Sequence, residues 1–218
     1  MKGLLLKDWY LLKKHSRFHL LAILFFPAGA VLSGQMFFLF YPCVLAGMLP
    51  ITLLAYDEDS KWVQYSATFP YKRSRIVGST YLIGLILIGS TLILTTIASV
   101  IFQMRTGGID FTILLVSLST TLLPAVLMPS ISLPFMFKYG VHKGRTAYYI
   151  VLGIIFGTFT LVPLLFREMA IPIPFLPILN ILLSLTLYVL LPLTLIIAVL
   201  IYAVSYLISV KVYEKKEL

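Results

Sequence analysis

Few side chains in this sequence could carry out chemistry, and two histidines near its start come closest. His15 and His19 stand four residues apart, a spacing that lets two imidazoles on one helix approach the same metal ion. A zinc site needs further protein ligands, and no third ligand accompanies this pair. We therefore interpret both histidines as residues at a membrane boundary, and we expect neither a metal nor a cofactor.

The segment GLILIGST at 84–91 has the glycine spacing of a phosphate-binding loop, followed by Ser and Thr. It lacks the lysine of such loops and lies in an apolar run, so we expect no nucleotide site in this chain. Gly84 and Gly89 fit better as positions where a neighbouring helix approaches closely. If ATP drives this protein, another subunit must bind the ATP.

The apolar segments carry no ionisable side chain at their centres. Because such groups are costly inside a bilayer and usually mark ion pathways or catalytic sites, their absence disfavours a proton-coupled transporter and a membrane-embedded enzyme. No nucleophile with its base can be assembled from the sequence, so we expect no enzymatic activity in this chain. The single cysteine, Cys43, cannot form an internal disulfide and is expected to be buried among apolar side chains.

The elements that position these residues follow from composition, since 60% of the 218 residues are hydrophobic and 11% are charged. Apolar runs of about 18 residues or more recur, which is the criterion for a transmembrane helix. The sequence therefore predicts an all-α, multi-pass protein of the cell membrane with one transmembrane domain over residues 1–218. The six predicted spans cover 18–31, 36–55, 77–103, 111–137, 147–166 and 178–210.

The distribution of the basic residues predicts the orientation of these spans in the membrane. Of the 17 Lys and Arg, only Arg105 and Arg167 fall on one side of the predicted topology. All the others lie on the opposite side, in the segments 2–17, 61–75, 138–145 and 211–216. Positive residues concentrate in cytosolic loops, so both termini are predicted to be cytosolic. The same bias accounts for the net charge of +9 without a nucleic acid partner, for which no reading motif is present.

The longest polar stretch follows the second span, and we predict one short helix over residues 57–69. Three acids would favour its start, where the positive end of a helix stabilises carboxylates: Asp57, Glu58 and Asp59. Pro70 would mark its end. This helix would then be the main structured element between the second and third spans.

Three aromatic residues recur at helical spacing within the same stretch and would form one stripe: Trp62, Tyr65 and Phe69. One interpretation is an interfacial helix whose aromatic rings lie among lipid headgroups. The other is a docking helix whose rings fill a groove on a cytosolic partner. From the residues alone, both interpretations stay open.

Four segments in order carry a resemblance to a known family: MKGLLLKDWYLLKK, ATFPYKRSRIV, LPFMFKYGVHKGR and SVKVYEKKEL. The sequence resembles the permease subunits of type-2 ABC transporters, and more narrowly their small six-span bacterial branch. The resemblance covers nearly the whole chain. In that family the loop after the second span supplies a coupling helix that contacts the ATP-binding subunit, and by position this loop is 57–69 here.

The resemblance implies a function for the acidic and aromatic residues of that loop. They would dock the ATP-binding subunit: Asp57, Glu58, Asp59, Trp62, Tyr65 and Phe69. The chain would be the permease of an ATP-driven exporter of hydrophobic or amphipathic cargo, paired with a second copy or a paralogue. The alternative is a stand-alone channel, carrier or immunity-type protein without an ATPase partner.

Two further segments are expected to lie along the membrane surface. Residues 2–17 are predicted to form an interfacial helix in which Leu5, Trp9 and Leu12 share a face and the lysines contact anionic lipid. Asp8 lies close to that apolar side, where a nearby lysine could pair with it. The prolines of 166–180 forbid a regular continuous helix, and the resemblance implies a short external re-entrant or interfacial element there.

Overall fold

The computed structural model describes residues 2–66, 68, 72–168 and 176–215, and the regular structure within these ranges is entirely helical. In chain order the elements are α1 (Lys2–His15), α2 (Arg17–Ser33), the 3₁₀ helix η1 (Met36–Leu39), α3 (Phe40–Asp59), α4 (Trp62–Ser66), α5 (Arg73–Thr106), α6 (Phe111–Tyr139), α7 (Val141–Glu168) and α8 (Leu176–Glu214). The predicted all-α fold class is confirmed. The three prolines expected to interrupt 166–180 are Pro172, Pro174 and Pro177, and the segment 169–175 lies outside the described residues.

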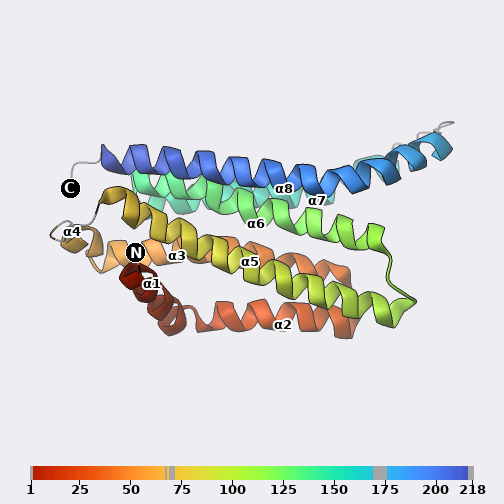
Figure 1. Ribbon diagram of the computed structural model, residues 1–218, viewed down its shortest axis with the longest axis horizontal. Helices are drawn as coiled ribbons and strands as arrows, with labels where there is room; N and C mark the ends of the chain where they lie inside the picture. The colour runs from red at the N-terminus through yellow and green to blue at the C-terminus, as the bar shows by residue number, and fades with distance from the viewer. Residues whose placement is uncertain (1, 67, 69–71, 169–175, 216–218) are drawn as a thin grey trace.

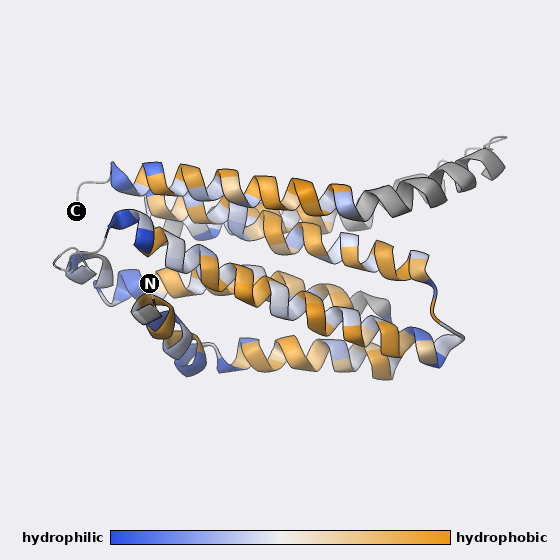
Figure 2. Cartoon of the chain, viewed as in Figure 1, coloured by the Kyte–Doolittle hydropathy of each residue, from blue (hydrophilic) through white to orange (hydrophobic). Residues whose placement is uncertain are grey.

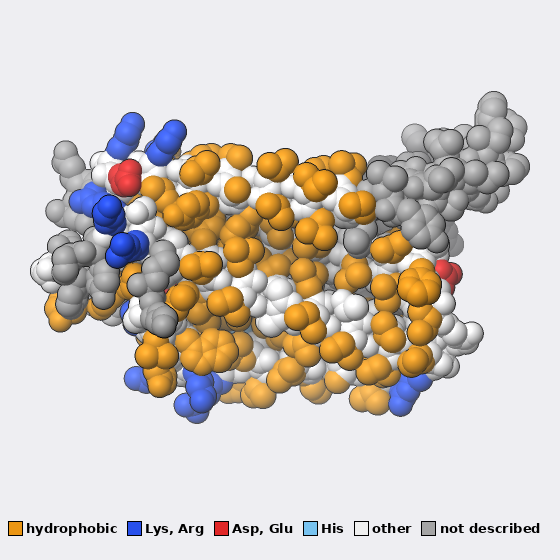
Figure 3. All heavy atoms as spheres, viewed as in Figure 1, with side chains coloured by type: hydrophobic (Ala, Val, Ile, Leu, Met, Phe, Trp, Pro, Cys, Tyr) orange, Lys and Arg blue, Asp and Glu red, His pale blue; other side chains and the backbone are white. Residues whose placement is uncertain are grey.

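The long helices run side by side along the bundle, whereas α1 lies across one end of it (Figure 1). The start of α1, the short α4 and the end of α8 all lie at this end, and the connection between α5 and α6 lies at the other (Figure 1). Most Lys and Arg in view gather at the first end, and the surface between the ends is hydrophobic (Figures 2 and 3). We call the first end, formed by segments 2–17, 57–66, 72–75, 138–145 and 211–215, the basic end.

Several described helices are long and apolar enough to cross a bilayer. Four segments meet the length and hydropathy expected of a membrane span: Phe40–Asp59, Arg73–Thr106, Phe111–Tyr139 and Pro192–Glu214. A fifth is obtained if α1 and α2, which meet at 77°, count as one broken span. The protein is therefore a multi-pass membrane protein, while the number six and the cytosolic position of the termini stay predictions.

The helix α6 lies at the centre of the packing, with contacts to α3, α5, α7 and α8. It contains Pro124, Pro129 and Pro134 without ending at any of them. On α3, a Cβ at Gly47 would lie 3.1 Å from Met128 Cβ, so the two helices approach closely at this point. Neighbouring helices of this kind are what make prolines tolerable inside a membrane helix.

The two glycines of the segment 84–91 have different surroundings. A Cβ at Gly84 would lie 2.7 Å from the Tyr202 hydroxyl of α8 and 3.2 Å from Pro50 Cγ of α3. Nothing lies within 4 Å of the same atom at Gly89. The prediction of close helix packing is confirmed for Gly84, whereas among the described residues Gly89 has no neighbour within 4 Å.

The predicted helix over residues 57–69 is wrong in its boundaries. The helix α3 continues through Asp59, so the three acids form its last turn instead of the first turn of a separate helix. The chain breaks at Lys61, which has a φ of 54°, and α4 then covers only Trp62–Ser66. No helix-breaking residue stands between the apolar span and the acids, so the helix of the span simply extends through them.

The helix α1 exists where it was predicted, but its buried face differs from the expected one. Leu4, Asp8 and Leu12 are buried, and they follow one another at the i, i+4 spacing of a single helix face. Trp9 is 47% exposed instead of sharing that face with Leu12. A charged side chain thus lies in the middle of the packed face of α1, which requires a partner.

Candidate functional site

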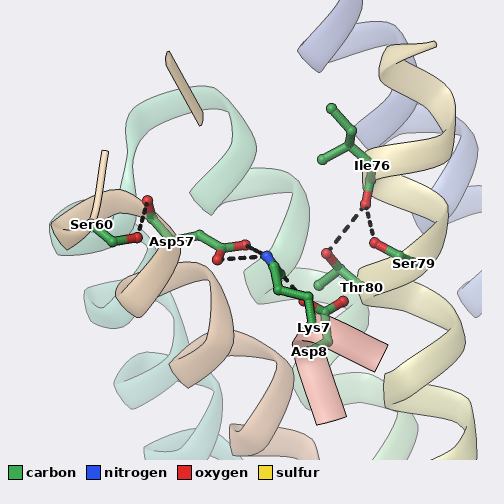
Figure 4. Close-up of polar contacts among 7 residues, drawn as sticks. All are labelled: Lys7, Asp8, Asp57, Ser60, Ile76, Ser79 and Thr80. Atoms are coloured by element: carbon green, nitrogen blue, oxygen red, sulfur yellow. Dashed lines mark hydrogen bonds and ion pairs between the residues drawn. The ribbon is translucent and has the colours of Figure 1, made fainter. Parts of the chain in front are cut away.

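The partner of the buried Asp8 is Lys7, which also joins α1 to α3. The Lys7 ammonium on α1 lies 2.7 Å from both carboxylate oxygens of Asp57 at the end of α3 and 3.1 Å from Oδ1 of Asp8 (Figure 4). Asp57 is itself buried. One cation therefore serves two carboxylates and fastens α1 to the last turn of α3.

Burial and charge act in opposite directions on Asp8. Removal from water raises the pKa of its carboxyl above the usual value, and the neighbouring Lys7 charge and its hydrogen bond lower it. The nearby Asp57 charge raises this pKa further, and the Ser79 hydroxyl of α5, which donates to the Ile76 carbonyl at 2.8 Å, lies on the facing helix. Asp8 thus lies between α1 and α5, and its pairing with a nearby lysine, expected from the sequence, is confirmed.

Glu58, the second of the three acids at the end of α3, contacts α7 instead of α1. Its Oε2 accepts a hydrogen bond of 2.8 Å from the backbone N–H of Val141, the first residue of α7. Gly140, with a φ of 84°, forms the turn between α6 and α7, and a Cβ there would lie 3.2 Å from Glu58 Oε1. The glutamate therefore satisfies an N–H group at the start of α7 and places its charge at the favourable end of that helix.

Of the remaining predicted docking residues, Asp59 and Tyr65 face outward, whereas Trp62 is half-buried. Asp59 is exposed, and Tyr65 on α4 is 58% exposed. The Trp62 ring lies 5.7 Å from the Tyr65 ring and 4.6 Å from the Lys7 ammonium, in the geometry of a cation–π contact. Phe69, the third member of the predicted stripe, lies outside the described residues.

Beneath Trp62 lies a cavity of about 40 Å³ where five of the long helices and α4 meet. Its lining residues are Leu54, Asp57, Glu58, Trp62, Ile76, Met136, Phe137, Val141 and Tyr213. They come from α3, α4, α5, α6, α7 and α8. Through Trp62, α4 thus lines a cavity that it shares with five of the long helices.

The start of α5 is tied to the end of α8 at the same place. The Arg73 guanidinium donates hydrogen bonds of 3.2 and 3.0 Å to the backbone carbonyls of Tyr213 and Glu214. A cation at this position satisfies carbonyl groups left open at a helix C-terminus. The Tyr213 ring packs edge-on against Phe137 of α6, with the ring centroids 5.4 Å apart.

Sequence reasoning placed the acids and aromatics in one loop but did not find their partners. Lys7, Arg73 and Val141 are 50, 140 and 83 residues from the groups they contact. The one sequence feature that pointed to any of these contacts was Asp8, an acid close to the apolar side of the basic segment 2–17. That signal identified the need for a lysine but not the second carboxylate.

Of the two histidines considered for a metal site, His15 takes part in an aromatic contact. The ring of His15 packs against Tyr56 with centroids 4.5 Å apart. Over the described part of the chain, no group of three or more His, Cys, Asp and Glu lies close enough to hold a metal ion. The contacts that define this end are thus ion pairs, helix caps and aromatic packing.

Comparison with known protein families gives a match that covers nearly the whole chain. The model of the family described as ABC-2 family transporter protein matches residues 3–214. No curated protein and no solved structure shows significant similarity.

Proposed function

Since this chain belongs to the ABC-2 family of transporter proteins, it is a membrane permease component, and we propose that it works with a separate ATP-binding subunit that docks on α4. ATP binding would move that subunit, and α4 would pass the movement to the bundle. We further propose that the chain exports hydrophobic or amphipathic molecules: the direction rests on the family resemblance, and the cargo class on the apolar spans, which carry no ionisable side chain at their centres. A second copy or a paralogue completes the membrane part.

The observation that carries this proposal is the position of α4. This five-residue helix presents Tyr65 to solvent on its outer side and covers the junction of the long helices on its inner side. Aromatic anchors on a short exposed helix suit a groove on another protein.

The six candidate docking residues divide into two groups under this proposal. Asp59, Tyr65 and Phe69 contact the ATP-binding subunit directly, together with the outer edge of Trp62. Asp57 and Glu58 hold the segment in place through Lys7 and Val141. The proposal therefore assigns docking to Asp59 and the three aromatic residues and positioning to the two engaged acids.

A first test is to purify the chain from its native host in mild detergent and to identify the proteins that accompany it. We expect a subunit with a phosphate-binding loop that contains the lysine missing from 84–91. A Tyr65→Ala/Phe69→Ala variant should retain at least about tenfold less of that subunit, since a good aromatic anchor contributes about 2 kcal/mol or more.

The matched control is Tyr149→Ala on α7, because Tyr149 is also 58% exposed. This variant should retain the ATP-binding subunit in full. Equal retention by both variants would rule out docking through α4. Purification without any ATP-binding subunit would favour the stand-alone channel or carrier.

A further inference from the structure

A groove of about 460 Å³ runs between α5 and α8, which lie side by side near the basic end (Figure 1). Its surface is almost entirely apolar. The side chains that form it include Tyr81, Leu82 and Leu85 from α5 and Tyr202, Ala203 and Tyr206 from α8. Exposed apolar side chains are ordinary on a membrane helix, but a groove of this volume has the size of a ligand site.

The floor of the groove is rigid at Tyr81 and Tyr202, because the hydroxyls of these two tyrosines are engaged in the protein. Tyr202 donates to the backbone carbonyl of Tyr81 at 2.8 Å, and Ser205 donates to the carbonyl of Ser130 at 2.6 Å. With its single proton used, Ser205 accepts from the Tyr81 hydroxyl at 2.6 Å, and Tyr81 accepts from Ser209 at 2.7 Å. The buried hydroxyl network fixes the tyrosine rings, so the groove needs no rearrangement to receive a ligand.

The rings themselves form a continuous aromatic surface. The Tyr81 ring lies edge-on to Tyr202 and Tyr206, with centroids 5.1 and 5.4 Å apart. The close approach at Gly84, where a Cβ would lie 2.7 Å from the Tyr202 hydroxyl, holds α5 against α8 beside this surface. Such a floor offers contact area to a flexible hydrocarbon chain without a loss of freedom in the protein.

The mouth of the groove at the basic end is positive. Arg75 is exposed and lies one turn before Gly78 and two turns before Leu82, on the same side of α5 as this wall of the groove. Lys72 is also exposed at the start of this helix, whereas Arg73 turns to the end of α8. In the described part of the chain, no hydrogen bond or ion pair involves the Arg75 side chain. An arginine at this depth reaches the phosphate level of an anionic leaflet.

The length of the groove distinguishes a lipid chain from a second protein helix. From Gly78 to Leu85 it extends for about 10 Å along α5, at about 1.5 Å per residue. This is less than one leaflet, which is about half of a hydrocarbon core of about 30 Å. A spanning helix would need a seam through both leaflets, whereas an acyl chain needs only one.

We propose that this groove binds one acyl chain of an anionic phospholipid from the leaflet at the basic end, with the lipid phosphate at Arg75. The site lies apart from α4 and does not depend on an ATP-binding partner. It would act as a resident lipid site that fills the space between α5 and α8.

Native mass spectrometry of the full chain in mild detergent tests the site, with dioleoyl phosphatidylglycerol and dioleoyl phosphatidylcholine as the probes. The first phosphatidylglycerol should bind about tenfold more tightly than phosphatidylcholine. Ala203→Phe, which fills the groove, should reduce binding of both lipids about tenfold. Arg75→Gln should remove only the preference for phosphatidylglycerol.

Two variants serve as controls. Val204→Phe changes the exposed residue that follows Ala203 on α8, and Lys211→Gln removes an exposed base at the basic end. Both should bind lipid as the unchanged chain does. Lipid binding that is the same in all four variants would overturn the proposal. A loss of dimer in Ala203→Phe, with lipid binding intact, would show that a second copy occupies the groove and would also overturn it. Because Arg75→Gln changes only an exposed side chain, its result stands even if Ala203→Phe fails to fold.

Discussion

At the residue scale, the central feature is one cation shared by two acids that belong to different helices. Lys7 lies 2.7 Å from Asp57 and 3.1 Å from Asp8, and both carboxylates are buried. Buried charges are tolerated only when they are paired and hydrogen-bonded. Loss of the cation therefore leaves two uncompensated acids against the same apolar packing, which costs more than the loss of a surface ion pair.

We predict that Lys7→Met lowers the stability of the protein by about 2 kcal/mol, below the range for fully buried pairs because the Lys7 side chain is 23% exposed. The melting temperature in detergent should fall by about 4–8 °C for a chain of this size. Lys13→Met, at an exposed position of the same helix, should leave it unchanged. Equal melting of the two variants would mean that the Lys7 contacts do not stabilise the fold.

The same variant should show a defined pH dependence. Burial already raises the pKa of Asp8, and removal of Lys7 takes away the charge that lowers it. A carboxyl with a raised pKa in the folded state binds protons more tightly there than in the unfolded state, so stability increases as the pH falls. Lys7→Met should thus recover melting temperature between pH 7 and pH 5 relative to the unchanged chain. A deficit that stays constant over this range would contradict a buried unpaired acid.

Glu58 gives a second prediction at this scale, because its carboxylate caps α7. Glu58→Ala should expose the Val141 N–H group, raise its hydrogen-exchange rate and cost about 1 kcal/mol, as the loss of a helix cap does. Asp59→Ala removes the neighbouring exposed acid and should change neither quantity. Unchanged exchange at Val141 in Glu58→Ala would show that this hydrogen bond does not persist.

At the element scale, the sequence predicted the long helices well and the short connecting ones poorly. Apolar runs define the long helices because the bilayer requires hydrogen-bonded backbone over about 20 residues. The boundary of α3 was wrong because acids are tolerated in a last helical turn when another part of the chain supplies a cation and an N–H group. Those partners, Lys7 and Val141, come from distant segments that local patterns cannot reveal.

In the candidate docking site, too, local spacing could be predicted from the sequence and contacts between distant segments could not. Its aromatic residues could be predicted from their spacing, and Tyr65 is exposed as a docking residue must be. The separation of Asp57 and Glu58 from Asp59 could not be predicted, because it depends on which side of α3 meets α1 and α7. The last turn of α3 thus contains two acids that contact other helices, Asp57 and Glu58, and one exposed acid, Asp59.

At the scale of the whole molecule, the prediction that both termini are cytosolic can be tested with single cysteines, since the one native cysteine, Cys43, is buried. Ser60→Cys and Ile109→Cys place an exposed thiol at opposite ends of the bundle. In intact cells, a membrane-impermeant maleimide should label only Ile109→Cys. Labelling of Ser60→Cys without permeabilisation would reverse the predicted orientation.

The central claim is that α4 is the element through which an ATP-binding subunit contacts this permease. Site-specific photo-crosslinking tests it most directly: a benzophenone maleimide is attached to Tyr65→Cys and, as the matched position, to Tyr149→Cys, and the membranes are irradiated. We predict a cross-link to the ATP-binding subunit from position 65 and none from position 149. A cross-link from position 149 alone, or none from position 65 in a complex that retains the ATP-binding subunit, would contradict the account.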